Sequence, residues 1–149
     1  RGFMTLGEDR LQLAARLGQT LACLFLDLDG FKHVNDTLGH DEGDEVLRDT
    51  AEALKETFRA SDLIGRIGGD EFAVLLLCDE SDQVETLRTR LETALETVNQ
   101  RTSRPYRLAL SMGLATKAPG ENLSLEDLMD TADQRMYTDK IARKGSESR

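Results

Sequence analysis

The chain has 149 residues, of which 39% are hydrophobic and 32% are charged, so it can form one globular domain with its own core. Its formal net charge of −9 argues against a surface for nucleic acid polymers or anionic lipids. No apolar run approaches the length of a membrane span, and no secretory signal opens the chain. We therefore expect a single cytoplasmic domain over residues 1–149, although a parent protein could still be anchored in a membrane.

Hydrophobic periodicity predicts helices and strands that are interleaved along the chain. The predicted elements are a helix over 3–17, a strand over 21–26, helices over 31–38 and 44–58, strands over 63–67 and 72–77, a helix over 82–99, a strand over 106–113 and a helix over 124–141. This order indicates an α+β fold with a central, mostly antiparallel sheet flanked by helices, of the ferredoxin-like or polymerase-palm type. Ser124 and Asp127 have the spacing of a capping box. Cys23 and Cys78 lie in or beside apolar runs without zinc-like spacing, which predicts buried, reduced thiols.

The first candidate site follows the apolar strand over 21–26. That strand leads into Asp27, Leu28 and Asp29, so it places carboxylates at a strand end that a ligand can reach. Asp27 would be a sound metal ligand there, and the carbonyl of Leu28 could supply a further oxygen. Asp29 precedes a predicted helix, so we expect it to cap that helix.

Two other kinds of site begin with a similar pattern. A calcium-binding EF-hand loop is excluded because Phe31, Lys32 and Leu38 stand where oxygen ligands and a glycine are needed. Phosphatases of the haloacid dehalogenase type have a threonine where this chain has Phe31, and they also require a later acidic pair. That class stays a remote alternative, which would form a covalent phosphate on Asp27.

The second candidate site is the turn between the strands over 63–67 and 72–77. It reads Gly68, Gly69, Asp70 and Glu71, which is also what an ordinary exposed hairpin turn can contain. Glycine pairs suit tight hairpins because they accept positive φ, and they let the backbone approach a phosphate closely. The two carboxylates could then serve as metal ligand and proton acceptor.

Together the two sites form a more specific pattern. The first continues from Leu26 as Leu26-Asp27-Leu28-Asp29-Gly30-Phe31-Lys32-His33-Val34-Asn35-Asp36, then Gly39-His40 and Gly43-Asp44, and the second is Gly68-Gly69-Asp70-Glu71-Phe72. In this order and at this separation they resemble the GGDEF family of diguanylate cyclases, from near residue 1 to about residue 144. The resemblance implies a sheet of five strands and an enzyme that condenses two GTP molecules into cyclic di-GMP.

The resemblance also implies how residues divide the work between two domains that meet as a homodimer, each holding one GTP. Mg²⁺, or Mn²⁺ in its place, would be bound by Asp27, the carbonyl of Leu28, Asp70 and Glu71, and either Asp70 or Glu71 would take the proton. Guanine would be read by Asn35 and Asp44, with His40 nearby. The triphosphate would be contacted by Gly30, Phe31, Lys32, Gly68, Gly69, Lys140 and Lys144.

Both ends of the chain depart from the family pattern. A Gly-Arg-Asn segment usually follows the position of Lys140, and Lys144 would replace its arginine with poorer bidentate geometry. Of the family's opening motif only Arg1 could remain, so we expect the chain to begin inside its domain. A sensory or dimerisation region is expected upstream.

A third set of residues matches the family's inhibitory product site. Arg59 and Asp62 form its R-x-x-D motif, and Arg90 is a candidate additional ligand, for which Arg88 competes. The same spacing is also common for a local ion pair at a helix end. If this site binds product, the chain is either a cyclase with feedback inhibition or a catalytically silent receptor for cyclic di-GMP.

Overall fold

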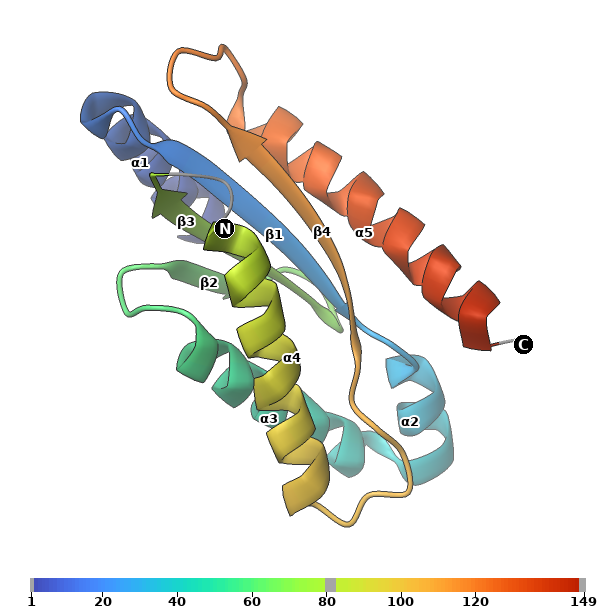
Figure 1. Ribbon diagram of the computed structural model, residues 1–149. Helices are drawn as coiled ribbons and strands as arrows, with labels where there is room; N and C mark the ends of the chain where they lie inside the picture. The colour runs from blue at the N-terminus through green and yellow to red at the C-terminus, as the bar shows by residue number, and fades with distance from the viewer. Residues whose placement is uncertain (1, 80–82, 148–149) are drawn as a thin grey trace.

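The computed structural model describes residues 2–79 and 83–147 (Figure 1). Its elements are α1 (Gly2–Leu17), β1 (Thr20–Leu28), α2 (Phe31–Leu38), α3 (His40–Thr57), β2 (Leu63–Arg66), β3 (Glu71–Cys78), α4 (Gln83–Arg101), β4 (Leu110–Lys117) and α5 (Leu125–Glu147). This confirms the predicted order of helices and strands. Arg1 and Asp82, which the sequence analysis assigned to the opening motif and to a helix start, lie outside the described residues.

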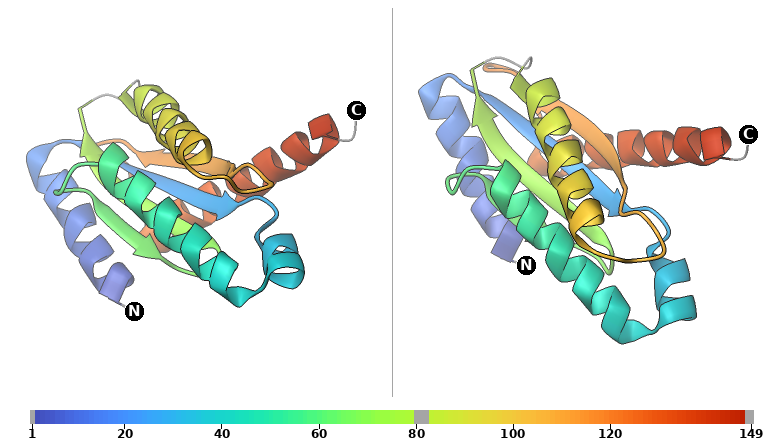
Figure 2. Two further views of the ribbon diagram at one scale, coloured as in Figure 1. Left: turned by 90° about the horizontal axis from the view of Figure 1, so that it is seen from below. Right: turned by 60° about the horizontal axis from the view of Figure 1, so that its bottom comes forward.

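Helices cover both faces of the sheet, so the domain has three layers (Figures 1 and 2). On one face α2, α3 and α4 pack on alternate residues of β1 and β3, and on the other face α1 and α5 pack on the intervening residues. All nine residues of β1 are buried. A strand that contributes to both cores has no solvent face, which explains its continuous apolar run. Its polar end is therefore the place where the central strand can meet a ligand.

The strands lie in the order β2-β3-β1-β4, and every pairing is antiparallel. The prediction of five strands is wrong for the described part of the chain, which forms four. Before β4, the amide of Asn99 bonds both backbone groups of Leu108, at 3.0 and 2.7 Å, so the predicted strand start at 106 stays outside the ladder. After β4, the chain turns at Gly120, where φ is 88°, and enters a helix that continues to residue 147.

Two helix boundaries differ from their predicted positions, and one predicted cap is confirmed. α3 begins at His40 rather than Asp44, because Gly39 adopts a φ of 93° and the helix restarts directly after it. α5 continues beyond residue 141. At its start Ser124 Oγ accepts a hydrogen bond from the Asp127 amide at 3.0 Å, as the capping-box spacing predicts.

Tight packing fixes α5 on the sheet. A side chain at Gly113 in β4 would collide with the backbone of Ala132 and Met136, so only glycine allows the helix to cross there. Cys23 and Cys78 are both buried and unbonded, as predicted, and burial raises the pKa of Cys23 to about 12.

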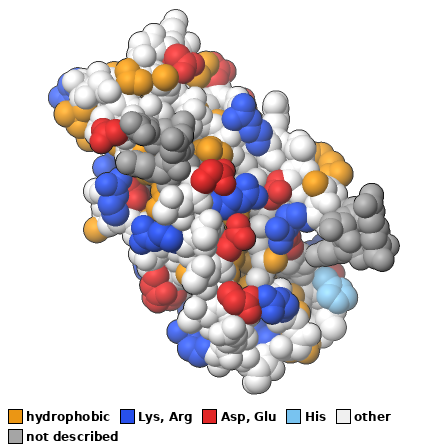
Figure 3. Space-filling model, in the orientation of Figure 1, with side chains coloured by type: hydrophobic (Ala, Val, Ile, Leu, Met, Phe, Trp, Pro, Cys, Tyr) orange, Lys and Arg blue, Asp and Glu red, His pale blue; other side chains and the backbone are white. Residues whose placement is uncertain are grey.

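The outer surface mixes charges of both signs, as Figure 3 shows for one face. Acidic and basic side chains alternate across that face, and neither sign forms a broad patch there. Among the helices of residues 2–79 and 83–147, none is both long and apolar enough to cross a bilayer.

Candidate active site

Strand pairing brings the two sequence motifs together. In the antiparallel register of β1 and β3, Asp27 lies opposite Glu71, and the Leu28 amide donates to the Asp70 carbonyl at 3.1 Å. The C-terminal end of β1 and the hairpin before β3 thus form one site. Asp27 is thereby brought beside the consecutive acids Asp70 and Glu71, which are more than 40 residues away in the sequence.

Asp27 is the most enclosed of these acids, with only 7% of its surface exposed. Its Oδ2 accepts a short hydrogen bond from Lys140 Nζ at 2.6 Å. Its Oδ1 is buried and has no hydrogen-bond partner within residues 2–79 and 83–147. A buried carboxylate oxygen without a partner is costly, so this atom is suited to a cation that arrives with a ligand.

The closeness of these charged groups shifts the pKa values of Asp70, Glu71 and Lys140. Burial, followed by the closeness and charge of Asp27, raises the pKa of Asp70 to about 6, although Lys140 opposes the shift. Burial and the charge of Asp27 likewise raise the pKa of Glu71. Burial lowers the pKa of Lys140, but its acidic neighbours raise it by more. The site therefore holds more negative charge than a single lysine offsets.

The residues present fit a hard divalent cation, although they do not form a complete cage. Within the described ranges, no three histidine, cysteine or acidic side chains converge closely enough to hold a metal alone. The unpartnered oxygen of Asp27 and the raised pKa values of Asp70 and Glu71 are nevertheless what an oxygen-ligated cation would relieve. Magnesium commonly takes one or two carboxylates and completes its shell with phosphate oxygens and water.

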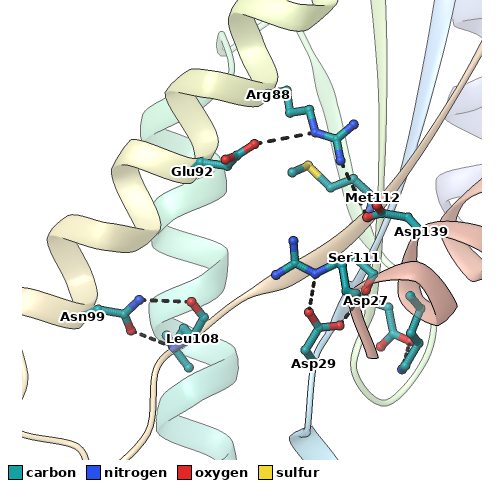
Figure 4. Close-up of polar contacts among 11 residues, drawn as sticks. Asp27, Asp29, Arg88, Glu92, Asn99, Leu108, Ser111, Met112 and Asp139 are labelled. Atoms are coloured by element: carbon teal, nitrogen blue, oxygen red, sulfur yellow. Dashed lines mark hydrogen bonds and ion pairs between the residues drawn. The ribbon is translucent and has the colours of Figure 1, made fainter. Parts of the chain in front are cut away.

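Asp29 does not cap α2, contrary to expectation. The N-cap of α2 is Gly30, in a left-handed conformation with φ of 73°, and no side chain caps this helix end. Asp29 instead accepts from Ser111 Oγ at 2.6 Å and from Arg143 Nε at 2.9 Å (Figure 4). The left-handed glycine turns the chain so that the carboxylate faces β4 and α5. The sequence analysis missed Ser111 and did not assign a function to Arg143.

The hairpin glycines also differ from expectation. Neither Gly68 nor Gly69 has positive φ. A side chain at Gly68 would lie 2.9 Å from a carboxylate oxygen of Glu71, so this glycine leaves room for that acid. Arg66 holds the turn from one side by donating to the carbonyls of Gly68 at 3.1 Å and Gly69 at 2.8 Å.

The proposed guanine-reading residues lie on neighbouring helices. Asn35 on α2 packs so closely against Gly43 on α3 that any side chain at Gly43 would displace it. The Oδ1 atom of Asn35 is buried and has no hydrogen-bond partner among the described residues. Asp44 is exposed and lines a hollow between α3 and β2. His40 is the exposed first residue of α3.

The remaining phosphate candidates lie at two helix ends. Phe31 packs against the core at the uncapped start of α2, and Lys32 beside it is exposed. Lys140 lies inside the site on α5, at Asp27. Lys144 is exposed one turn later on the same helix. The structure therefore brings Lys140 to the carboxylates directly.

Arg59, Asp62 and Arg90 come together away from the carboxylates. Buried Asp62 accepts from the backbone amide of Arg59 at 2.9 Å and from its guanidinium at 3.4 Å, while 67% of the Arg59 side chain stays exposed. Arg90 lines a hollow of about 260 Å³ with both residues. Arg88 instead forms ion pairs with Glu92 and Asp139, each at 3.6 Å (Figure 4). This arrangement favours Arg90 over Arg88 as the third member.

Comparison with known proteins connects this geometry to one family. The family model described as "Diguanylate cyclase, GGDEF domain" matches residues 1–146. MucR of Pseudomonas aeruginosa, a bifunctional diguanylate cyclase and cyclic di-GMP phosphodiesterase, is 39% identical over 130 residues. The match covers 87% of this chain but only 19% of that relative. The chain therefore spans about a fifth of the length of this larger protein.

Solved structures share the fold. The diguanylate cyclase SiaD of Pseudomonas aeruginosa, solved in complex with its activator SiaC, matches with a TM-score of 0.84 at 30% identity, covering 95% of this chain and 54% of SiaD. The GGDEF domain of DgcB from Caulobacter crescentus, solved in complex with c-di-GMP, matches with a TM-score of 0.77 at 30% identity. That match covers 93% of this chain and 85% of the DgcB domain.

Proposed function

Because the chain belongs to the GGDEF family of diguanylate cyclases, we propose that it condenses two GTP molecules into cyclic di-GMP and releases two pyrophosphates. The observation that carries this proposal is the placement of Asp70 and Glu71 beside Asp27, one of whose carboxylate oxygens is buried without a partner among the described residues. Such a site suits a reaction in which negative charge on phosphate must be balanced and a hydroxyl must lose its proton.

In the proposed reaction two copies of the domain meet as a homodimer, each with one GTP. The 3′ oxygen of each GTP forms a bond to the α-phosphorus of the other, the bond to pyrophosphate breaks, and the hydroxyl proton passes to Asp70 or Glu71. Burial and the charge of Asp27 raise the pKa values of both carboxylates before a metal binds. Mg²⁺, or Mn²⁺ in its place, held by Asp27, the Leu28 carbonyl, Asp70 and Glu71, would polarise the α-phosphate.

The chain's own cations and amides position the triphosphate. Lys140 can exchange its bond with Asp27 for one to a phosphate oxygen with little movement, because it already lies inside the site. The uncapped start of α2 offers backbone amides near Phe31 and Lys32 to the same anion. Gly68 and Gly69 let the hairpin backbone approach the phosphates, and exposed Lys144 extends the cationic surface along α5.

Base selection is assigned to Asn35 and Asp44. Guanine presents N1–H and N2–H donors, which a carboxylate accepts, and the unpartnered Oδ1 of Asn35 is a second acceptor. His40 lies on the same helix, one turn before Asp44. Adenine lacks this donor pair, so GTP should be preferred over ATP.

Arg59, Asp62 and Arg90 are proposed to bind the product and give feedback inhibition. The exposed guanidinium of Arg59 can stack on guanine and bond phosphate, while Asp62 holds its backbone in place. Arg59→Ala should abolish inhibition by added cyclic di-GMP and leave the initial rate within about twofold, because the site lies apart from the carboxylates. Unchanged inhibition in that variant would refute the assignment.

A catalytically silent receptor for cyclic di-GMP is the second candidate, supported by the same three residues. It would bind product but release no pyrophosphate from GTP.

The buried, reduced cysteines fit a cytoplasmic domain. Because its relatives are longer proteins, we further propose that an upstream sensory or dimerisation region controls pairing of the domains.

The test is chromatographic analysis of the nucleotides formed from GTP with Mg²⁺ at high protein concentration, beside a Glu71→Ala variant. Cyclic di-GMP from the parent chain and none from the variant is the expected result. Product formation that survives Glu71→Ala would place the chemistry elsewhere, and tight product binding without any turnover would favour the receptor.

A further inference from the structure

The last turns of α5 are attached to the domain differently from the rest of that helix. Up to Met136, buried apolar residues anchor it to the sheet: Leu125, Leu128, Ala132 and Met136. From Tyr137 to Lys144 no residue is buried. Figure 2 shows this end of the helix reaching past the sheet. Hydrophobic packing therefore does not fix the segment that carries Lys140.

Polar contacts replace the missing apolar ones, and they come from one face of the helix. Asp139 Oδ2 accepts from the Met112 amide at 2.8 Å, Lys140 bonds Asp27, and Arg143 Nε donates to Asp29 Oδ2 at 2.9 Å. The other face is open to solvent, with Tyr137 63% and Ile141 54% exposed. These three contacts, together with the Arg88–Asp139 ion pair at 3.6 Å, attach this segment to the rest of the domain.

The Asp29 carboxylate is held in a fixed orientation for its bond with Arg143. Its other oxygen accepts from Ser111 Oγ at 2.6 Å, and Ser111 is fully buried within β4. Only 20% of the Asp29 side chain and 38% of the Arg143 side chain are exposed. Because the carboxylate is already oriented by Ser111, less conformational freedom is lost when Arg143 bonds it than in an ordinary surface pair.

We propose that Arg143 is a positioning residue that, paired with Asp29, keeps the last turns of α5 over the end of β1 and so keeps Lys140 in place for the triphosphate. Lys140 and Arg143 are three residues apart on one helix face, and Asp27 and Asp29 are two apart along the extended chain. The two pairs therefore attach the same helix segment to the same strand end.

The two ion pairs are expected to behave differently when substrate binds. Lys140 must leave Asp27 to contact a phosphate, so its own bond cannot hold the helix during the reaction. The Arg143–Asp29 pair lies one turn away and is not consumed. It keeps α5 attached to the end of β1 while Lys140 moves from Asp27 to the phosphate. Less conformational entropy is therefore lost when Lys140 binds the phosphate.

The test compares Arg143→Ala with Arg143→Lys and with a matched control, Arg135→Ala. Arg135 also lies on α5 and bonds the sheet, donating to the Leu114 carbonyl at 2.7 Å, but it lies away from the carboxylates. We expect Arg143→Ala to raise the KM for GTP about fivefold with kcat within about twofold, because ground-state binding is what the pair supports. Arg143→Lys should recover part of the loss, and Arg135→Ala should leave the KM unchanged.

A second readout does not require turnover. In the protein without nucleotide, amides over 137–144 should exchange with solvent faster in Arg143→Ala than in the parent or in Arg135→Ala. Equal exchange and equal KM in Arg143→Ala and Arg135→Ala would overturn the inference. The kinetic part rests on the proposed function. If the parent chain neither binds nor converts GTP, that function fails, and the exchange comparison alone decides whether Arg143 positions the helix.

Discussion

Two clusters of charged side chains in this domain affect the pKa values of their carboxylates differently. In the first, here called the carboxylate cluster, Asp27, Asp70 and Glu71 share Lys140. The second, the Arg104 cluster, consists of Glu42, Asp49, Arg104 and Tyr106. There Arg104 donates to Glu42 at 2.9 Å and to Asp49 at 2.5 Å, and the Tyr106 hydroxyl donates to Glu42 at 2.6 Å.

The pKa of Glu42 shifts in the opposite direction from the pKa values of Asp70 and Glu71. Hydrogen bonds from Tyr106 and Arg104 lower the pKa of Glu42 despite its partial burial. In the carboxylate cluster burial and mutual repulsion raise the pKa of Asp70 and of Glu71. The Arg104 cluster joins α3 to the loop before β4 and stabilises the ionised form of Glu42, so it supports the fold. In the carboxylate cluster three acids share one lysine, so the excess of negative charge suits a cationic ligand.

The largest expected difference comes from the same isosteric change in each cluster. Asp27→Asn should lower GTP turnover at least about 100-fold, because it removes the charge of a ligand oxygen, and should leave stability nearly unchanged. Asp49→Asn should leave turnover within about twofold but cost about 1 kcal/mol, because it weakens a charge-assisted bond to Arg104. Kinetics and thermal unfolding of the two variants measure both effects. Equal loss of turnover in both would contradict the division between site and scaffold.

The next effect is on stability. The Arg104 side chain is only 9% exposed and bridges two acids, so Arg104→Ala should lower the free energy of unfolding by about 2 kcal/mol. Denaturant titration measures this directly. Glu42→Gln is the control, since it keeps the shape and should cost less. No measurable loss in Arg104→Ala would show that this cluster does not support the fold.

The smallest effect is a pair of opposite pH dependences in the protein without nucleotide. The pKa of Asp70 rises from 3.8 to about 6 on folding, so the folded state binds more protons, and this contribution to stability falls as pH rises between those values. Glu42 has a lowered pKa, so its contribution is lost as pH falls.

Asp70→Asn should therefore gain about 1 kcal/mol at pH 7, after allowing for solvent screening. Denaturant titrations from about pH 3 to 7 would measure both slopes, since the contribution of Glu42 is lost below its unfolded pKa of 4.5. An Asp70→Asn variant whose stability follows the parent at every pH would contradict the raised pKa.

Local sequence patterns predicted the elements and the position of the acids well. The continuous apolar run before Asp27 and the hairpin residues before Phe72 indicated two buried strands, and their pairing explains why Asp27 lies opposite Glu71. Periodicity predicted the four strands that the described residues form, and the fifth strand was expected from the family resemblance alone. The late start of β4 was not predictable from periodicity, since it depends on Asn99 bonding Leu108. Interactions between distant residues override local patterns at such points.

The same limit applies to the function of individual side chains. The sequence suggested that Asp29 caps α2, because its neighbours along the chain suit that role. Its partners Ser111 and Arg143 are 82 and 114 residues away, so only the folded chain reveals them. A signal for Arg143 did exist in its spacing from Lys140 on one helix face.

The central claim is tested most directly by the stoichiometry of GTP conversion in Mg²⁺, measured over a series of protein concentrations. We expect one cyclic di-GMP and two pyrophosphates for every two GTP consumed, with a rate per domain that increases with protein concentration because two domains must meet. Bound GTP with no cyclic di-GMP at any concentration, or a rate per domain independent of concentration, would contradict it.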